Sequence, residues 1–289
     1  MGSMDIKQNK RLEGGKMDKQ VLLINDLAGY GKVALSAMIP VLSHMGYNLY
    51  NLPTALVSNT LDYGKFDILE TTGYIRNTIG VWKELGFCFD AVSTGFIVSE
   101  LQAGVIAEYC REQAGNGTLI FVDPIMGDEG KLYNGVTQQT VGHMRRLTEV
   151  ADYIVPNYTE AVYLAGMPYK KDGITKEEAG NLIDRLRQIG AKSVIVTSAC
   201  VEGNDTVIGY DHKTGQRFFL PFTLIPVRFP GTGDIFSSVL MGKVLAGEGL
   251  RESTQKAMDI VKEIILRNRD NADKFKGIPV EVCLELIDI

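Results

Sequence analysis

The sequence predicts an α/β fold in which a mostly parallel sheet lies between two layers of helices. Short apolar runs of strand length alternate along the chain with amphipathic stretches of helical length, and repeated strand-then-helix order is typical of parallel sheets. The 289 residues are 45% hydrophobic and 22% charged, which is enough to bury a large core without disulfide bonds. Because no linker rich in proline or serine divides the chain, we expect one domain over residues 17–289.

The expected strands are short runs of β-branched, aliphatic and aromatic residues, such as TLIFV at 118–122 and SVIVT at 193–197. Two further runs, at 206–210 and 216–222, flank the sequence Asp-His-Lys-Thr-Gly, which predicts a hairpin. The strands expected before this hairpin span residues 21–25, 49–58, 91–94, 118–122, 153–155 and 193–197.

The stretches between these strands have the apolar spacing of amphipathic helices. Ser99 and Thr175 stand where N-caps belong, and two glutamates follow Thr175 in the first turn. The chain after Asp234 is expected to be mostly helical. The helices expected before it span residues 33–45, 70–85, 99–113, 137–147 and 176–188.

The composition argues against several classes of partner. A net charge of −5 argues against nucleic acid or an anionic membrane. The first 20 residues lack the apolar stretch of a signal peptide, and no run approaches the roughly 20 apolar residues of a membrane span. Four cysteines without a CxxC pair indicate free thiols in a reducing cytoplasm. Residues 1–16 are expected to be a disordered tail or an addition made for expression.

The segment Gly231-Thr232-Gly233-Asp234 precedes a strong helical pattern. Glycine lets the backbone approach a ligand closely, and the N–H groups and dipole at a helix start bind anions. Gly231, Thr232 and Gly233 can therefore hold a transferred phosphoryl group while Asp234 accepts a proton from a hydroxyl group. Taken alone, the segment also fits a plain glycine turn with an aspartate cap.

The stretch from Gly29 to Ala34 has the spacing G-x-G-x-x-A of a dinucleotide-binding turn, but we reject that interpretation. No Asp or Glu occurs between Asp26 and Asp62, where the ribose-binding acid would stand. The stretch is not a P-loop either, because Lys32 is followed by valine and the earlier glycine is missing. A turn that brings a substrate against the first strand and a purely structural turn both remain open.

Acidic and amide side chains follow two neighbouring strands of the expected sheet. Asp123 and Asp128 come after one strand, and Asn157 and Glu160 come after the next. Ligands of parallel sheets bind at this edge, and carboxylates there hold Mg²⁺ directly or through water. A solvated acidic loop and a capping box formed by Asn157 and Glu160 are the structural alternatives. No catalytic triad is visible in these segments, and the parts present suit phosphoryl transfer.

Together these segments resemble the ribokinase-like superfamily, and within it the vitamin B6 kinases, over nearly the whole chain. The Gly-Thr-Gly-Asp segment alone indicates the superfamily, whereas the two acidic motifs in this order are more specific. The matching motifs are NDLAGYGK (25–32), LPTALVSN (52–59), STGF (93–96), VDPIMGDEGKLY (122–133), PNYTEA (156–161), VTS (196–198) and GTGDIF (231–236).

This resemblance implies a ribokinase-like three-layer α/β/α sandwich. It also implies ATP-dependent phosphorylation of the 5′-hydroxymethyl group of pyridoxal, and of pyridoxine or pyridoxamine, in vitamin B6 salvage. Asp234 would be the base, and residues 231–233 the anion hole. The residues implied to organise Mg²⁺ are Asp128 and Glu160. Those implied near the nucleotide are Asp123, Asn157, Thr197, Ser198 and Phe229, with the 206–222 hairpin and the loop to Pro230 beside adenine. Those implied near the vitamer are Asn25 or Asp26, Ser58 and Phe96.

Several positions depart from the pattern of the B6 kinases. Val33-Ala34 stands where relatives often carry a polar residue or cysteine, and Leu61-Asp62 replaces a Thr-Gly of the vitamin pocket. Val155 replaces a threonine before Pro-Asn, which bears on a contact with a monovalent cation, K⁺ or Na⁺, or with phosphate. The alternatives are a hydroxymethylpyrimidine kinase of thiamine biosynthesis and a non-catalytic B6-binding protein, and the intact Asp234 argues against the latter. Such kinases are usually homodimers.

Overall fold

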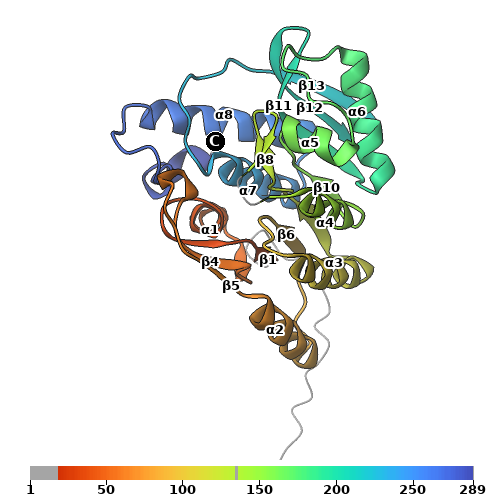
Figure 1. Cartoon of the computed structure of the whole chain (residues 1–289), viewed down its shortest axis with the longest axis vertical. Coiled ribbons are helices and arrows are strands. Elements are labelled where there is room, and N and C mark those ends of the chain that lie inside the picture. Colours follow the sequence, from red (N-terminus) through yellow and green to blue (C-terminus); the bar gives the residue numbers. More distant parts are fainter. Residues whose placement is uncertain (1–18, 134–135, 289) are drawn as a thin grey trace, which may run out of the picture.

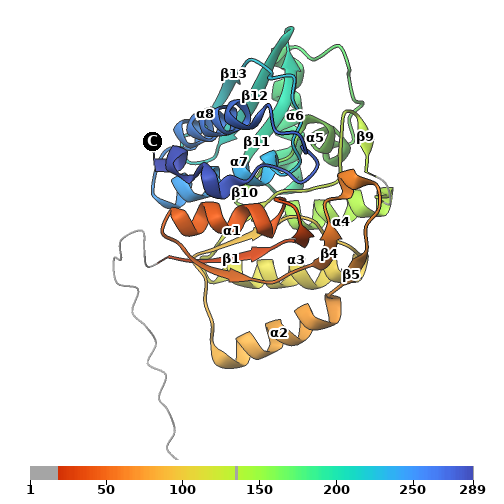
Figure 2. The ribbon, with the colours of Figure 1, turned by 90° about the vertical axis from the view of Figure 1, so that its left-hand side faces the viewer.

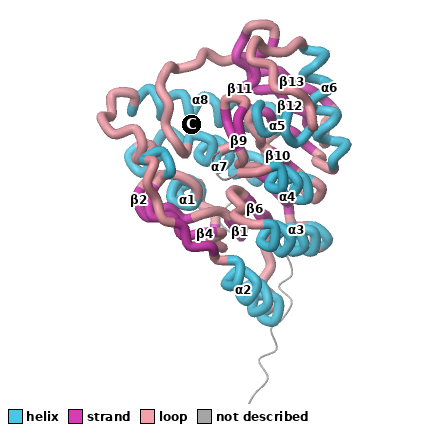
Figure 3. The backbone as a smooth tube through the Cα atoms, viewed as in Figure 1, coloured by secondary structure: helices cyan, strands magenta, loops and turns pink. Residues whose placement is uncertain are grey.

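The computed structural model describes residues 19–133 and 136–288, so the expectation for residues 1–16 lies outside the described residues. Its central element is an eight-stranded sheet with helices on both faces (Figures 1 and 3). Across the sheet, the order is β13 (Gln216–Pro221), β12 (Asn204–Asp211), β11 (Ser193–Val201), β10 (Tyr153–Ile154), β7 (Leu119–Val122), β6 (Ala91–Thr94), β1 (Gln20–Ile24) and β3 (Asn48–Asn51).

Neighbouring strands from β11 to β3 are parallel, and the predicted hairpin adds the antiparallel pairs β11–β12 and β12–β13. The predicted fold class is therefore confirmed. The chain passes from β1 to β3 on one side and later returns to β6 on the other side of β1. Such a reversal opens a crevice at the carboxyl ends of the two strands. The residues that follow β1 and β6 therefore border the expected ligand site.

Two layers of helices cover the sheet, and each layer buries its own hydrophobic cluster. Figure 2 shows the α1, α7 and α8 layer facing the viewer. One layer contains α2 (Thr72–Leu85), α3 (Glu100–Gly115), α4 (Gln138–Thr148), α5 (Tyr158–Ala165) and α6 (Lys176–Ile189). The other contains α1 (Leu35–His44), α7 (Thr232–Leu245) and α8 (Leu250–Asn268).

The predicted strand at 49–58 is two strands. Leu52-Pro53-Thr54 separates β3 from β4 (Ala55–Asn59), because proline has no N–H group for a sheet ladder. β4 pairs with β2 (Leu27–Tyr30) and β5 (Ile68–Glu70) in a second, three-stranded sheet. Gly29 consequently lies in a strand, whereas the sequence had suggested a turn.

Two helices begin two residues later than predicted, because a residue before each of them has a non-helical conformation or belongs to a strand. The helix expected from residue 33 begins at Leu35, because Ala34 has a φ of 48°, outside the helical region. Glu70 belongs to β5, so the next helix begins at Thr72. The predicted caps Ser99 and Thr175 both accept backbone N–H groups. No helix of the described residues has the length and apolarity that a bilayer crossing requires.

Candidate active site

Asp234 lies in the first turn of α7, which meets the distant segment of residues 25–34. Its Oδ2 accepts a hydrogen bond from the backbone N–H of Ala34 at 2.8 Å, across 200 positions of sequence. The side chain of Asn25, directly after β1, also hydrogen-bonds to this carboxylate. The carboxylate is thereby held in one orientation at the carboxyl end of the sheet.

The anion hole predicted at residues 231–233 forms the start of α7. Gly231 is the N-cap residue with a φ of 86°, a left-handed conformation that favours glycine. A Cβ atom at Gly231 would lie 2.2 Å from the carbonyl oxygen of Lys32. The first N–H groups of a helix have no partner within the helix. The start of α7 packs against the turn at residues 31–33. It therefore presents hydrogen-bond donors and the positive end of the helix dipole to a ligand.

Asn25 connects the two strands at which the sheet order reverses. It is 3% exposed, and its Oδ1 accepts the backbone N–H of Asp26 at 3.0 Å and that of Phe96 at 2.8 Å. Gly95 makes room for it, because a Cβ atom there would lie 2.4 Å from the Asn25 amide. Asn25 therefore orients the Asp234 carboxylate. That Asn25 or Asp26 faces a pyridine ring stays a prediction.

Three carboxylates interact electrostatically in this low-dielectric region. Burial raises the pKa of Asp234 to about 6, against the opposing hydrogen bonds from Ala34 and Asn25. Burial and the charge of Asp234 raise the pKa of Asp26 to about 7. The same two causes raise the pKa of Asp123, whose Oδ2 accepts a hydrogen bond from Ser237 Oγ at 3.0 Å. A cation or a proton would relieve this concentration of negative charge.

Glu160 and Asn157 form the capping box at the start of α5. Glu160 Oε2 accepts the backbone N–H of Asn157 at 2.8 Å, and Glu160 Oε1 accepts that of Met126 at 2.9 Å. Asn157 Nδ2 donates to the carbonyl oxygen of Gly127 at 2.8 Å, which ties the box to the acidic loop. Burial, followed by the charge of Asp123, raises the pKa of Glu160. The structural alternative, a capping box, is thus present, and the Glu160 carboxylate also interacts electrostatically with Asp123.

Asp128 lies in a small ribbon formed by β8 (Gly127–Asp128) and β9 (Lys131–Leu132), so the acidic loop is ordered. Asp128 borders a cavity of about 230 Å³, together with Glu129, Tyr133 and Arg228. Glu160 does not line this cavity. The two residues predicted to organise Mg²⁺ thus lie in different surroundings, joined through Asn157 and Gly127.

The described residues contain no cluster of three or more His, Cys, Asp or Glu side chains arranged to hold a metal ion. Mg²⁺ commonly keeps several water molecules and binds through one or two carboxylates and substrate phosphates. Buried carboxylates with raised pKa values fit such an ion, because its charge would offset their repulsion. Both carboxylate oxygens of Glu160 already accept backbone N–H groups. Glu160 is therefore suited to contact the metal ion through a water molecule.

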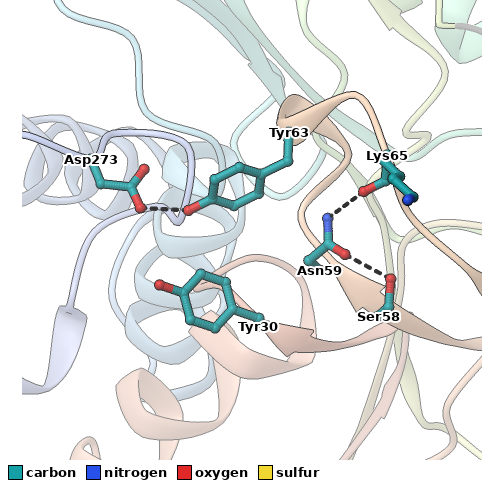
Figure 4. Close-up of a pocket in the computed structure, with 6 residues that line it drawn as sticks. All are labelled: Tyr30, Ser58, Asn59, Tyr63, Lys65 and Asp273. Atoms are coloured by element: carbon teal, nitrogen blue, oxygen red, sulfur yellow. Dashed lines mark hydrogen bonds between the residues drawn. The ribbon is translucent and has the colours of Figure 1, made fainter.

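The remaining predicted residues occupy varied positions. Thr197 and Ser198 lie at a bulge of β11, and Ser198 has a φ of 57°. Strain of this kind gathers at functional sites. Phe229 is 3% exposed in the α7-side core, and its carbonyl oxygen accepts a hydrogen bond from Thr232 Oγ1 at 3.3 Å. Ser58 borders an open cavity of about 440 Å³ (Figure 4). The predicted nucleotide and vitamer contacts of these residues stay predictions.

Some contacts of the site were absent from the sequence prediction. Ser237 stands three residues after Asp234, and this helical spacing could have indicated a shared face. The N–H group of Ala34 and the guanidinium of Arg228 gave no local signal. Lys32 forms an ion pair with Glu281. The rejection of a P-loop is consistent with this pairing, since a P-loop lysine reaches toward phosphates.

The comparisons with known proteins agree on one family. The phosphomethylpyrimidine kinase family model matches residues 35–278. A pyridoxal kinase of Paraburkholderia phymatum is 28% identical, over 86% of this chain and 88% of its own. A protein of Bacteroides thetaiotaomicron, provisionally assigned as a phosphomethylpyrimidine kinase and crystallised with pyridoxal, has a TM-score of 0.89 and 33% identity, over 94% of this chain and 96% of its own.

The crystal structure of a pyridoxal kinase from Lactobacillus plantarum has a TM-score of 0.84 and 27% identity, over 93% of this chain and 96% of its own. The resemblance inferred from the motifs is therefore confirmed. The chain belongs to the phosphomethylpyrimidine kinase family, and it is a kinase with the ribokinase-like fold.

Proposed function

We propose that this protein transfers the γ-phosphoryl group of ATP to the 5′-hydroxymethyl group of pyridoxal, and also to pyridoxine and pyridoxamine, in vitamin B6 salvage. The observation that carries the proposal is the Asp234 carboxylate, held by Ala34 and Asn25 at the start of α7. Pyridoxal in the Bacteroides neighbour and the name of the Paraburkholderia relative support the choice of acceptor.

The proposed reaction uses few groups of the chain. Asp234 accepts the proton of the hydroxymethyl group as its oxygen attacks the γ-phosphorus of ATP. The bond from the γ-phosphorus to the bridging oxygen breaks, which gives ADP and the 5′-phosphate. The N–H groups at the start of α7 stabilise the charge on the transferred phosphoryl group. Asn25 and Ala34 keep the Asp234 carboxylate aimed throughout.

Mg²⁺ is proposed as the metal, organised by Glu160 and Asp128, with Asp123, Asn157, Thr197 and Ser198 near the phosphates. When bound, the ion supplies positive charge to the triphosphate. The raised pKa values of Asp123 and Glu160 support a cation in this region. A requirement for K⁺ or Na⁺ is tested by omitting each ion from the assay.

A homodimer and a cytoplasmic location are proposed on the resemblance to B6 kinases. The three-stranded sheet supports the dimer, because Tyr30, Leu56 and Leu69 expose large apolar side chains there. Free thiols at Cys88, Cys110, Cys200 and Cys283 suit a reducing compartment. Light scattering of the purified protein distinguishes a dimer from a monomer.

A hydroxymethylpyrimidine is the second candidate acceptor. The name of the matching family favours it, and its ring also carries a hydroxymethyl group. A non-catalytic B6-binding protein has no need for a base at an anion hole. These candidate functions are distinguished by measuring ATP consumption with pyridoxal, pyridoxine, pyridoxamine, hydroxymethylpyrimidine and ribose. Turnover with a B6 vitamer is expected, and its absence would refute the proposed function.

The role of Asp234 is tested by Asp234→Asn. This variant keeps a similar shape but cannot accept the proton, so we expect kcat to fall by at least ~10²-fold with little change in ATP affinity. Asp184→Asn, at an exposed ion pair with Arg217, serves as the matched control and should keep full activity. Retained activity in Asp234→Asn would show that another group is the base.

A further inference from the structure

An ion pair joins two segments that border the candidate active site. Arg228 Nη1 donates a hydrogen bond to Asp62 Oδ1 at 2.8 Å, across 166 positions of sequence. Asp62 belongs to the 3-10 turn Leu61–Tyr63 that follows β4. Arg228 stands three residues before Gly231. The Asp62 side chain is 20% exposed and that of Arg228 is 63% exposed, so the guanidinium covers a largely buried carboxylate from the solvent side.

The segment that carries Asp62 is fixed at its base. Thr60 is buried, and its Oγ1 donates to the carbonyl oxygen of Phe275 at 2.6 Å. A Cβ atom at Gly31 would lie 2.2 Å from Thr60 Cγ2, so this segment lies directly against the turn at residues 31–33. That turn in turn contacts Gly231 through the Lys32 carbonyl. Contacts other than the ion pair thus already place the Asp62 segment close to the proposed anion hole.

The segment that carries Arg228 is also fixed. The next residue, Phe229, is buried in the core, and a Cβ atom at Gly277 would lie 3.0 Å from the Pro230 carbonyl oxygen. Arg228 also borders the cavity lined by Asp128 and Glu129. Its guanidinium therefore has the acidic residues Asp128 and Glu129 as neighbours across this cavity, and it hydrogen-bonds to Asp62 in the segment after β4.

We propose that Asp62 and Arg228 form a clasp that holds the Leu61–Tyr63 turn against the anion-hole loop and thereby positions the acceptor alcohol. This proposal rests on the proposed function. A partly exposed ion pair contributes little to global stability. Its effect is local: a turn held in one arrangement keeps the acceptor in a reactive geometry, and small displacements there reduce catalysis. Both are positioning residues, and we assign neither a contact with the reacting atoms.

The kinetic test uses Asp62→Asn, Arg228→Met and the double variant. Each single variant should lower kcat with pyridoxal by about 3–10-fold, while the KM for ATP changes by less than about 2-fold. The double variant should be no worse than the more affected single variant, because both substitutions remove one interaction. Arg228→Lys should restore part of the loss. Arg111→Met, which breaks an exposed ion pair with Glu149 outside the proposed site, should leave every constant unchanged.

A second readout needs no turnover. Backbone hydrogen exchange of residues 58–65 should become faster in Asp62→Asn and in Arg228→Met, and stay unchanged in Arg111→Met. If the wild-type protein phosphorylates no B6 vitamer, the proposed function fails, and hydrogen exchange still tests the clasp.

Three outcomes would overturn the clasp. The first is unchanged exchange at residues 58–65 in both single variants. The second is fully additive kinetic effects, which would mean that the two residues act separately. The third is a rise in the KM for ATP in Arg228→Met without any effect of Asp62→Asn, which would assign Arg228 to the nucleotide.

Discussion

At the scale of single residues, Asp234 illustrates how burial and hydrogen bonding oppose each other. Burial raises its pKa, while hydrogen bonds from Ala34 and Asn25 lower it, and the result is a value of about 6. A base with this pKa is ionised at neutral pH, yet it is more basic than an exposed aspartate. The sequence predicted Asp234 as the base, but the pKa of this carboxylate depends on Asn25, directly after β1, and on Ala34, directly before α1.

The first prediction concerns the pH dependence of kcat/KM, which reports the free enzyme. Because the base must be ionised, kcat/KM should fall about tenfold per unit as the pH drops below about 6. Asn25→Ala removes a hydrogen bond that lowers the pKa of Asp234, so the acid limb should move to higher pH. Met38→Leu alters the weak contact of Asn25 with Met38 Sδ and should leave the limb in place. A limb that stays at the same pH in Asn25→Ala contradicts this assignment.

At the scale of elements, the start of α7 and the turn at residues 31–33 form one unit. Gly231 can adopt its left-handed conformation and touch the Lys32 carbonyl because it has no side chain. The same turn supplies the Ala34 N–H group to Asp234. The helix therefore contributes the proposed anion hole, and the turn before α1 fixes Asp234, the proposed base, relative to it.

The second prediction separates this close packing from backbone strain. Gly231→Ala should displace the start of α7 and lower kcat by about 10²–10³-fold. Gly247→Ala is the matched control: Gly247 has a similar φ of 92°, and a Cβ atom there meets nothing within 4 Å. Both variants should lose about 1–2 kcal/mol from left-handed strain, but Gly247→Ala should keep its kcat. Equal losses of kcat in both variants would rule out the packing explanation.

At the scale of the whole molecule, the reversal of strand order brings together carboxylates that follow β1 and β7 with carboxylates of α5 and α7. Each has a folded-state pKa above its ordinary value, so these four groups bind more protons in the folded protein than in the unfolded chain in the window from about pH 4 to pH 7. Their contribution to stability should consequently decrease as the pH rises through this window. The protein tolerates this repulsion at the place where the proposed Mg²⁺ and phosphates would bind.

The third prediction follows for the free energy of unfolding. Asp123→Asn removes one buried charge and keeps an acceptor for Ser237. It should stabilise the ligand-free protein by about 1–3 kcal/mol at pH 8 and have little effect near pH 4.5, where Asp123 is protonated. Urea denaturation at both pH values measures the difference, with Asp184→Asn as a surface control. Lower stability of Asp123→Asn at pH 8 would refute the electrostatic account.

The sequence alone determined the fold class, the hairpin, the capped helices and the capping box of Asn157 and Glu160. These features depend on residue spacing and on side chains a few positions apart, so local patterns are sufficient to predict them. The motifs also identified the family, and the Gly231–Asp234 segment does begin α7. The predicted roles of the individual site residues stay predictions.

The tertiary structure decided the rest. It placed Gly29 in a second sheet, gave Ala34 a φ of 48° and joined Asp62 to Arg228. It also set the pKa of Asp234, through burial and a partner 200 positions away. Strand partners, strained backbone and buried charge depend on which distant segments become neighbours, and a local pattern in the sequence carries no such information.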